Sequence, residues 1–202
     1  MLPAIQSLPQ GIWVLEALLE PATCAEVLQR AAGKFRPARL HAAGRRNSEA
    51  FFSWPELRAR LIERLHQRQV DYPMLGLTAA VIGPHLECYR YEAGDYVAPH
   101  TDARAPMGAG AASGFTLLVY LDSGAAGGET LFPEHDLKIQ SVAGNALLFS
   151  QELLHAGAPV TAGRKHILRA DVAITSPTPG SSLDAERIRP GAERPEPPDR
   201  RA

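Results

Sequence analysis

The feature that most constrains the fold is a change of pattern near residue 86. From there to residue 174 the chain consists of short apolar and β-branched segments, separated by glycine, proline and polar residues. Strands at such spacing are typical of a β-sandwich or barrel. Two earlier segments show helical periodicity instead. We therefore expect a mainly β protein in which α-helices support a sandwich or barrel.

The two helical segments have recognisable beginnings. The first begins at Pro21 and extends to about Ala32, and the second begins at Pro55 and extends to about Gln69. Residues 33–54 between them are basic and irregular. We interpret them as a solvated loop that leads into a packed strand. An alternative is an edge that faces the substrate, because arginines beside aromatic residues can bind an anionic or peptidic ligand.

The strand-like segments are short. We expect strands over 86–91, 96–101, 115–121, 129–132 and 165–174, and a turn followed by a buried strand within 142–149. Residues 104–114 are rich in alanine and glycine, which indicates a loop. Residues 71–84 are interpreted as a loop with a short apolar run at 79–82. From Ser176 onward proline, glycine, serine and charged residues dominate without apolar periodicity, so we expect a disordered tail over 176–202.

Composition excludes several classes of protein. The chain of 202 residues has a formal net charge of −1, so no global field favours nucleic acid or an anionic membrane. No apolar run reaches membrane-spanning length, and the first residues do not resemble a signal peptide. The two cysteines, Cys24 and Cys88, are far apart in the sequence and are expected to be reduced thiols. We expect a cytoplasmic protein.

The candidate metal site begins with His100-x-Asp102. In an extended strand, residues two positions apart point to the same face, so an imidazole and a carboxylate can lie side by side. His155 follows a later apolar run and precedes a loop, and a sandwich could return it to this pair. Two histidines and one carboxylate form the facial set that holds Fe(II) and leaves positions open. The chain has seven histidines, so the first pair alone would be weak evidence.

Further motifs carry a resemblance to a known family. They are Tyr91-x-x-Gly94-x-Tyr96-x-x-His100-x-Asp102, Thr116-Leu117-Leu118-Val119-Tyr120-Leu121, Gly127-Gly128-Glu129-Thr130-Leu131-Phe132-Pro133, Gly144-x-Ala146-Leu147-Leu148-Phe149, His155-x-Gly157-x-Pro159-Val160 and Lys165-His166-Ile167-Leu168-Arg169. In this order they resemble the catalytic core of the Fe(II)/2-oxoglutarate-dependent dioxygenases, and in particular the prolyl 4-hydroxylase-like branch. The resemblance covers most of the chain outside the expected tail.

The resemblance implies a fold, a metal site and cofactors. The fold would be a double-stranded β-helix, also called a jelly roll, of the cupin-like kind. Residues 86–175 would form this core, and residues 1–85 would support it within one compact domain. His100, Asp102 and His155 would be both catalytic residues and iron ligands. The cofactors would be Fe(II), 2-oxoglutarate as co-substrate and O2, with ascorbate as a reductant.

The resemblance also implies residues that bind 2-oxoglutarate. Lys165 stands ten positions after the second histidine and would pair with the C5 carboxylate, which needs a partner when it is buried. Arg169 lies on the same face by strand alternation. It could share that carboxylate, reach the substrate or pair with Asp171. Thr116 matches a threonine that joins the lysine in some relatives, and Tyr91 matches a tyrosine of the same pocket.

The substrate is the least constrained part of the prediction. Residues 39–54 and 103–114 would build its pocket, with Arg46, Asn47 and Arg104 as candidate contacts. The leading hypothesis is hydroxylation of a prolyl or other side chain in a peptide or protein. Alternatives are a hydroxylase of a free amino acid or small metabolite, and a non-catalytic cupin-like metal-binding module. Demethylation of nucleic acid is disfavoured by the small net charge.

Overall fold

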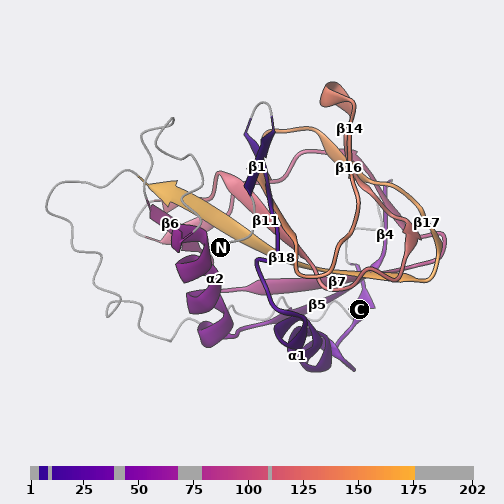
Figure 1. Ribbon diagram of the computed structural model, residues 1–202, viewed down its shortest axis with the longest axis horizontal. Helices are drawn as coiled ribbons and strands as arrows, with labels where there is room; N and C mark the ends of the chain where they lie inside the picture. Colours follow the sequence, from indigo (N-terminus) through magenta and orange to yellow (C-terminus); the bar gives the residue numbers. More distant parts are fainter. Residues whose placement is uncertain (1–4, 9–10, 39–43, 68–78, 109–110, 176–202) are drawn as a thin grey trace, which may run out of the picture.

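Two β-sheets that face each other form the centre of the protein, and two helices lie outside the larger sheet (Figure 1). The computed structural model describes residues 5–8, 11–38, 44–67, 79–108 and 111–175. The tail expected over 176–202 lies outside the described residues. All the strand pairs described are antiparallel, and the prediction of a double-stranded β-helix with supporting helices is confirmed.

The larger sheet has nine strands. In spatial order they are β1 (Ile5–Leu8), β2 (Ile12–Leu15), β15 (Ala146–Ser150), β11 (Phe115–Tyr120), β18 (Arg164–Thr175), β7 (Leu86–Glu92), β5 (Ser48–Phe52) and β3 (Arg36–Pro37), with β6 (Ala79–Ile82) also paired to β18. β18 therefore pairs with three other strands and forms the middle of the sheet.

The smaller sheet has five strands. Their order is β14 (Leu137–Ile139), β13 (Thr130–Phe132), β16 (His155–Gly157), β8 (Tyr96–His100) and β4 (Arg45–Arg46). Two further pairs join β9 (Pro106–Gly108) to β10 (Ala111–Ala112) and β12 (Ala126–Gly127) to β17 (Val160–Ala162). A short 3-10 helix, η2, spans Pro133–His135.

The helices begin where their prolines predict. α1 spans Pro21–Ala31 and α2 spans Pro55–Gln67, and each has proline as its first residue. Leu57, Leu61 and Leu65 recur every four residues along α2 and are buried, which matches an amphipathic helix with one face on the core. Among the described residues no helix has the length and apolar character needed to cross a membrane.

Strand alternation on β11 divides the core into two layers. Leu117 and Val119 belong to the cluster shared with the helices, whereas Leu118 and Tyr120 belong to the cluster between the two sheets. Successive side chains of a strand point to opposite faces, so a strand buried on both faces is apolar throughout. The apolar run at 115–121 thus lines the inter-sheet space on one side and anchors the helices on the other.

Three segments expected to be irregular contain strands. Residues 71–84 include β6, which pairs with β18. Residues 33–54 include β3, β4 and β5, and β5 pairs with β7 along five residues. Residues 104–114 include the β9–β10 pair. Strands of two or three residues leave no periodicity in the sequence, and their existence depends on the partner strand instead.

Gly144 fixes the approach of the chain to α1. Its φ is +83°, a left-handed conformation that glycine adopts without strain. The N–H group of Leu19 donates to the carbonyl oxygen of Gly144 at 3.1 Å. A Cβ atom at Gly144 would lie 2.4 Å from the carbonyl oxygen of Leu19, so only glycine fits this contact.

Candidate active site

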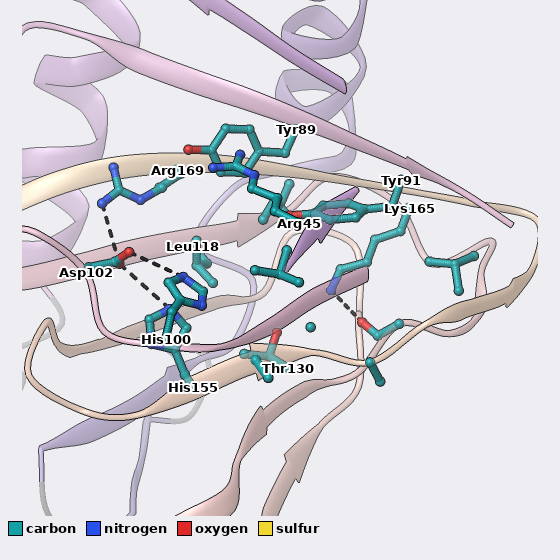
Figure 2. A pocket seen from close by; sticks show the side chains of 17 residues that line it. Arg45, Tyr89, Tyr91, His100, Asp102, Leu118, Thr130, His155, Lys165 and Arg169 are labelled. Atoms are coloured by element: carbon teal, nitrogen blue, oxygen red, sulfur yellow. Dashed lines mark hydrogen bonds and ion pairs between the residues drawn. The ribbon is translucent and has the colours of Figure 1, made fainter. Parts of the chain in front are cut away.

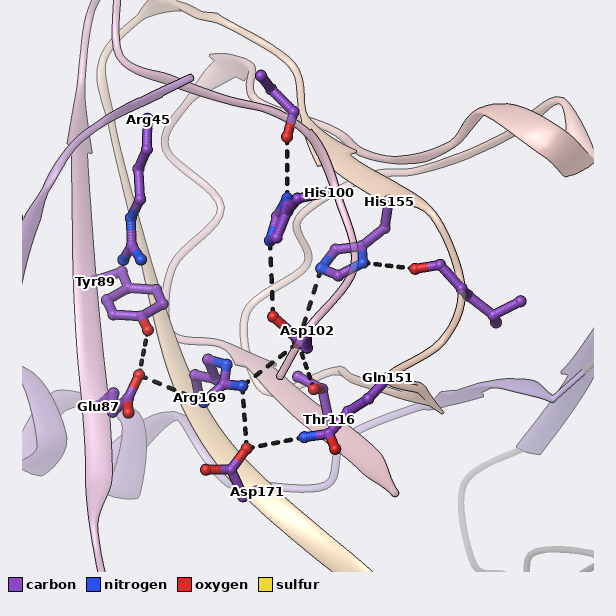
Figure 3. Close-up of polar contacts among 12 residues, drawn as sticks. Arg45, Glu87, Tyr89, His100, Asp102, Thr116, Gln151, His155, Arg169 and Asp171 are labelled. Atoms are coloured by element: carbon purple, nitrogen blue, oxygen red, sulfur yellow. Dashed lines mark hydrogen bonds and ion pairs between the residues drawn. The ribbon is translucent and has the colours of Figure 1, made fainter. Parts of the chain in front are cut away.

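The smaller sheet and the chain that leaves it bring three metal-ligating side chains together. His100 ends β8 and His155 begins β16, and these two residues are paired across the antiparallel strands. Asp102 follows His100 by two positions. One ligand atom from each of the three side chains lies within 4.8 Å of the others. Nε2 of His100 is 3.7 Å from Oδ1 of Asp102, and Nε2 of His155 is 3.8 Å from Oδ2 (Figure 3).

Backbone carbonyls fix the tautomer of both histidines. Nδ1 of His100 lies 2.9 Å from the carbonyl oxygen of Ala98, and Nδ1 of His155 lies 3.0 Å from that of Leu153. A carbonyl oxygen only accepts, so each Nδ1 must carry the proton. Nε2 of each neutral ring then keeps its lone pair and faces Asp102. Metal-binding histidines are commonly oriented in this way.

The two oxygens of Asp102 have different surroundings. Oδ2 accepts a hydrogen bond from the hydroxyl of Thr116 at 2.5 Å and lies 3.4 Å from Nη2 of Arg169. Burial raises the pKa of Asp102, but the neighbouring His100, the charge of Arg169 and the Thr116 hydroxyl together lower it more, to well below its usual range. The carboxylate is therefore ionised, and Oδ1, which Thr116 and Arg169 do not contact, would be the oxygen available to a metal.

The histidines differ in their proton affinity. The adjacent carboxylate of Asp102 raises the pKa of His100, whereas burial lowers the pKa of His155. Two imidazoles with inward Nε2 atoms and one ionised carboxylate are the ligand set of non-haem Fe(II) sites. The residues present therefore fit an Fe(II) ion.

Lys165 places a buried cation in the same cleft. Its side chain is only 4% exposed, and Nζ donates to the carbonyl oxygen of Gly128 at 2.5 Å. The ammonium also lies 5.7 and 5.3 Å from the ring centroids of Tyr91 and Tyr120. Among the described residues no carboxylate lies within 4.0 Å of Nζ. Burial lowers the pKa of Lys165 to about 8.

The cleft between the sheets joins Lys165 to the metal ligands (Figure 2). Its lining includes Arg45, Tyr89, Tyr91, Val97, His100, Asp102, Leu118, Gly128, Thr130, His155, Lys165, Ile167 and Arg169. A buried cation costs free energy unless an anion accompanies it. A dicarboxylate such as 2-oxoglutarate, with one end at the metal ligands and the other at Lys165, fits this arrangement.

Thr116 does not lie beside Lys165, contrary to the sequence-based expectation. On the paired strands Thr116 is opposite Asp171, whereas Lys165 stands six positions earlier on β18. At about 3.3 Å per residue the separation is roughly 20 Å. The hydroxyl of Thr116 binds Asp102 instead. Tyr91 does line the cleft, next to the ammonium of Lys165.

Arg169 is held by three carboxylates. Its guanidinium lies 3.0 Å from Asp171, 3.4 Å from Glu87 and 3.4 Å from Asp102. Of the alternatives left open by the sequence, the pairing with Asp171 is the one observed. Figure 3 shows that Arg169 lies at the Asp102 end of the cleft, so its contact is with the metal-binding carboxylate.

Thr130 is a cleft residue that the sequence reasoning missed. It lies on β13, lines the cleft, and its hydroxyl is 2.8 Å from the hydroxyl of Tyr120. The motif Gly127-Gly128-Glu129-Thr130 contains the signal, a hydroxyl residue directly after a glycine turn. A hydroxyl two residues beyond Gly128, whose carbonyl binds Lys165, is well placed to contact a ligand at this end.

The three candidate substrate residues lie outside the cleft lining. Arg46 is an exposed side chain paired with Asp95 at 3.0 Å. Arg104 is exposed and pairs with Glu152 at 2.6 Å. Asn47 is buried.

The cleft residue of this segment is Arg45, the neighbour of Arg46. Adjacent residues of a strand face opposite sides, so an error of one position moves a side chain out of the site.

The jelly-roll fold and this ligand set define a mononuclear non-haem iron oxygenase. Residues 86–170 match the profile of the 2OG-Fe(II) oxygenase superfamily. This segment carries the superfamily profile, and together with His100, Asp102 and His155 it identifies a dioxygenase that uses Fe(II) and 2-oxoglutarate. None of the curated proteins compared with the sequence matches it.

Solved structures with the same fold include prolyl hydroxylases. The viral collagen prolyl hydroxylase of Paramecium Bursaria Chlorella virus-1, in complex with 2OG, has a TM-score of 0.62 at 22% identity, over 81% of this chain and 96% of its own. A prolyl-4-hydroxylase of Pseudomonas putida has a TM-score of 0.62 at 19% identity, over 81% and 92%. A Trichoplax adhaerens prolyl hydroxylase, in complex with a hypoxia inducible factor peptide fragment, has a TM-score of 0.57 at 20% identity, over 83% and 84%.

Proposed function

We propose that the protein hydroxylates an unactivated C–H bond in a prolyl or other side chain of a peptide or protein. The oxidation would be coupled to decarboxylation of 2-oxoglutarate to succinate. The observation that carries the co-substrate assignment is Lys165, a buried cation without a carboxylate partner among the described residues, in the cleft of the metal ligands. Peptide substrates are supported by the similarity to prolyl hydroxylases, one of them solved with a peptide.

The side chains of the site have distinct tasks in this reaction. His100, Asp102 and His155 would hold Fe(II), and Lys165 would pair with the distal carboxylate of 2-oxoglutarate. When bound, these two groups supply the oxidising chemistry that no amino-acid side chain provides. Thr116 and Arg169 keep Asp102 ionised and leave Oδ1 directed toward the metal position.

Apolar side chains exclude water from the cleft. Leu118 and Ile167 line it from the larger sheet and Val97 lines it from the smaller one. Exclusion of water strengthens the pairing of Lys165 with an anion, because electrostatic attraction increases as the local dielectric constant falls. The same lining would protect a reactive intermediate from hydrolysis.

The test is a coupled assay with the purified protein. Fe(II), 2-oxoglutarate and ascorbate, which we propose as the reductant, are added with peptides or free amino acids. Succinate and a mass gain of one oxygen atom in the substrate are measured. His100→Ala should abolish succinate formation, whereas His85→Ala, a change at an exposed histidine, should preserve it. Absence of both succinate formation and 2-oxoglutarate binding would refute the proposed function. Oxidation of free amino acids alone would refute the peptide assignment only.

We also propose a cytoplasmic location. Cys24 and Cys88 are both buried and free of disulfide bonds, which suits a reducing compartment. Fractionation of cells that express a tagged full-length chain would check this, and recovery from an oxidising compartment would contradict it.

A further inference from the structure

Arg45 projects into the cleft from the edge of the smaller sheet. It lies on β4, opposite Val97 of β8, the strand that ends at His100. Its guanidinium lies 4.4 Å from the ring centroid of Tyr89. Figures 2 and 3 both place this group next to Tyr89 and away from His155. Arg45 therefore lines the same cleft as Lys165 and the metal ligands.

The neighbours of Arg45 fix its orientation without using all its donors. Nε donates to the side-chain oxygen of Asn47 at 2.6 Å, and Asn47 is itself buried. Nη2 is buried and has no hydrogen-bond partner within the part of the chain that the structure describes. A buried N–H group without an acceptor carries a free-energy penalty, which a ligand oxygen would relieve. Arg45 thus combines a fixed position with an unused donor.

The charge of Arg45 is already balanced. Oε2 of Glu49 lies 3.6 Å from Nη2, close enough for electrostatic pairing but too far for a hydrogen bond. Two exposed arginines from the segments expected to surround the substrate are also paired, Arg46 with Asp95 and Arg104 with Glu152. A carboxylate beside Arg45 would leave a net negative charge there. A neutral carbonyl oxygen would accept the free donor without changing the charge.

Resting on the function proposed above, we propose that Arg45 determines specificity by donating to a main-chain carbonyl oxygen of the substrate. The substrate class is then a polypeptide with amide carbonyls on both sides of the oxidised residue, and not a free amino acid, whose carbonyl is part of a carboxylate. Tyr89 contributes by holding the guanidinium plane, and Asn47 by fixing its rotation. Neither of these two residues needs to contact the substrate.

The test compares Arg45→Met and Arg45→Lys with Arg46→Met. Methionine keeps an apolar side chain against Tyr89 and removes the N–H donors of the guanidinium. Lysine keeps the positive charge but lacks the planar guanidinium. Arg46→Met makes the same change at the next residue, which is exposed and outside the cleft lining. The probes are a randomised pool of pentapeptides with acetylated N-termini and amidated C-termini, and free L-proline. Hydroxylation is followed by mass spectrometry, and the KM for 2-oxoglutarate is taken from succinate formed without substrate.

Wild-type protein should oxidise members of the blocked peptide pool. Arg45→Met should raise the KM for a selected peptide at least tenfold and change kcat by less than about threefold, with the KM for 2-oxoglutarate within twofold of wild type. Arg45→Lys should resemble Arg45→Met, and Arg46→Met should stay within twofold of wild type. Unchanged peptide kinetics in Arg45→Met would overturn the inference.

Two other outcomes would also overturn the inference but leave the oxygenase chemistry intact. One is wild-type protein that forms succinate and oxidises no blocked peptide. The other is a rise in the KM for 2-oxoglutarate that equals the rise for the peptide, which would place Arg45 in the cofactor site. Failure of wild-type protein both to bind 2-oxoglutarate and to form succinate would refute the proposed function as well.

Discussion

Replacement of Thr116 by valine tests whether the hydroxyl holds the iron ligand Asp102. Valine has nearly the shape of threonine, and Thr116 is fully buried, so the change removes a donor without opening a large cavity. After the change, Oδ2 of Asp102 keeps the contacts with Arg169 at 3.4 Å and His155 at 3.8 Å, and no longer accepts the hydroxyl hydrogen bond. The carboxylate should then rotate more freely, and its orientation toward the metal should be less well defined.

The magnitude follows from the strength of the bond that is lost. A hydrogen bond to a charged group contributes about 1.5–3 kcal/mol, and the bond from Thr116 at 2.5 Å belongs to that class. Each 1.4 kcal/mol corresponds to about a tenfold change in an equilibrium constant. Thr116→Val should therefore weaken metal binding by about 10- to 100-fold, the range found for outer-shell partners of metal ligands.

The assay is a titration of the metal-free protein with Co(II), read from its visible absorption, and with Fe(II) under anaerobic conditions in competition with a chelator. Thr161→Val, the same change at an exposed position of β17, serves as the control and should bind both metals like wild type. Metal affinity within twofold of wild type in Thr116→Val would refute the reasoning. If the KM for 2-oxoglutarate rose instead, Thr116 would act on the co-substrate, as its sequence context had indicated.

Two further predictions concern Lys165 and Gly144. Burial lowers the pKa of Lys165 to about 8, so the cation that binds 2-oxoglutarate is lost as the pH rises through that value. The KM for 2-oxoglutarate should increase above pH 8, by up to about tenfold per pH unit. In Lys165→Met, steady-state assays over pH 6.5–9.5 should give a high KM without this dependence, and a flat wild-type profile would contradict the assignment. Gly144→Ala should destabilise the fold by about 1–3 kcal/mol or more, because it adds backbone strain and a clash with Leu19. Gly33→Ala has a similar φ of +75° but open space around it, so urea denaturation should show a smaller loss.

Two of the three metal ligands, His100 and Asp102, could be predicted because their geometry is local. His100 and Asp102 share a face through their spacing of two, and His155 was found from its place between an apolar run and a loop. The structure brings these three side chains together as expected. Lys165 was found through the family motif, and its burial near Tyr91 agrees with the role expected of it.

Contacts between strands could not be predicted in the same way. Thr116 was expected to join Lys165 but lies at the Asp102 end of the cleft, because the register of β11 against β18 is not encoded by local periodicity. The sequence-based prediction named Arg46, and not Arg45, as a candidate substrate contact for a related reason. β4 has two residues, and only its pairing with β8 decides which of them faces inward.

β18 carries two of the cleft cations on one continuous strand. Lys165 and Arg169 are four positions apart on the same face, which corresponds to roughly 13 Å. Neighbouring strands on both sides hold this spacing, so it cannot stretch or shorten with the ligand. The sheet therefore fixes the distance between the ammonium of Lys165 and the end of the cleft that holds the metal ligands. An acid one methylene shorter or longer than 2-oxoglutarate would lose one of its two contacts, and we expect the enzyme to discriminate among 2-oxo diacids by length as well as by charge.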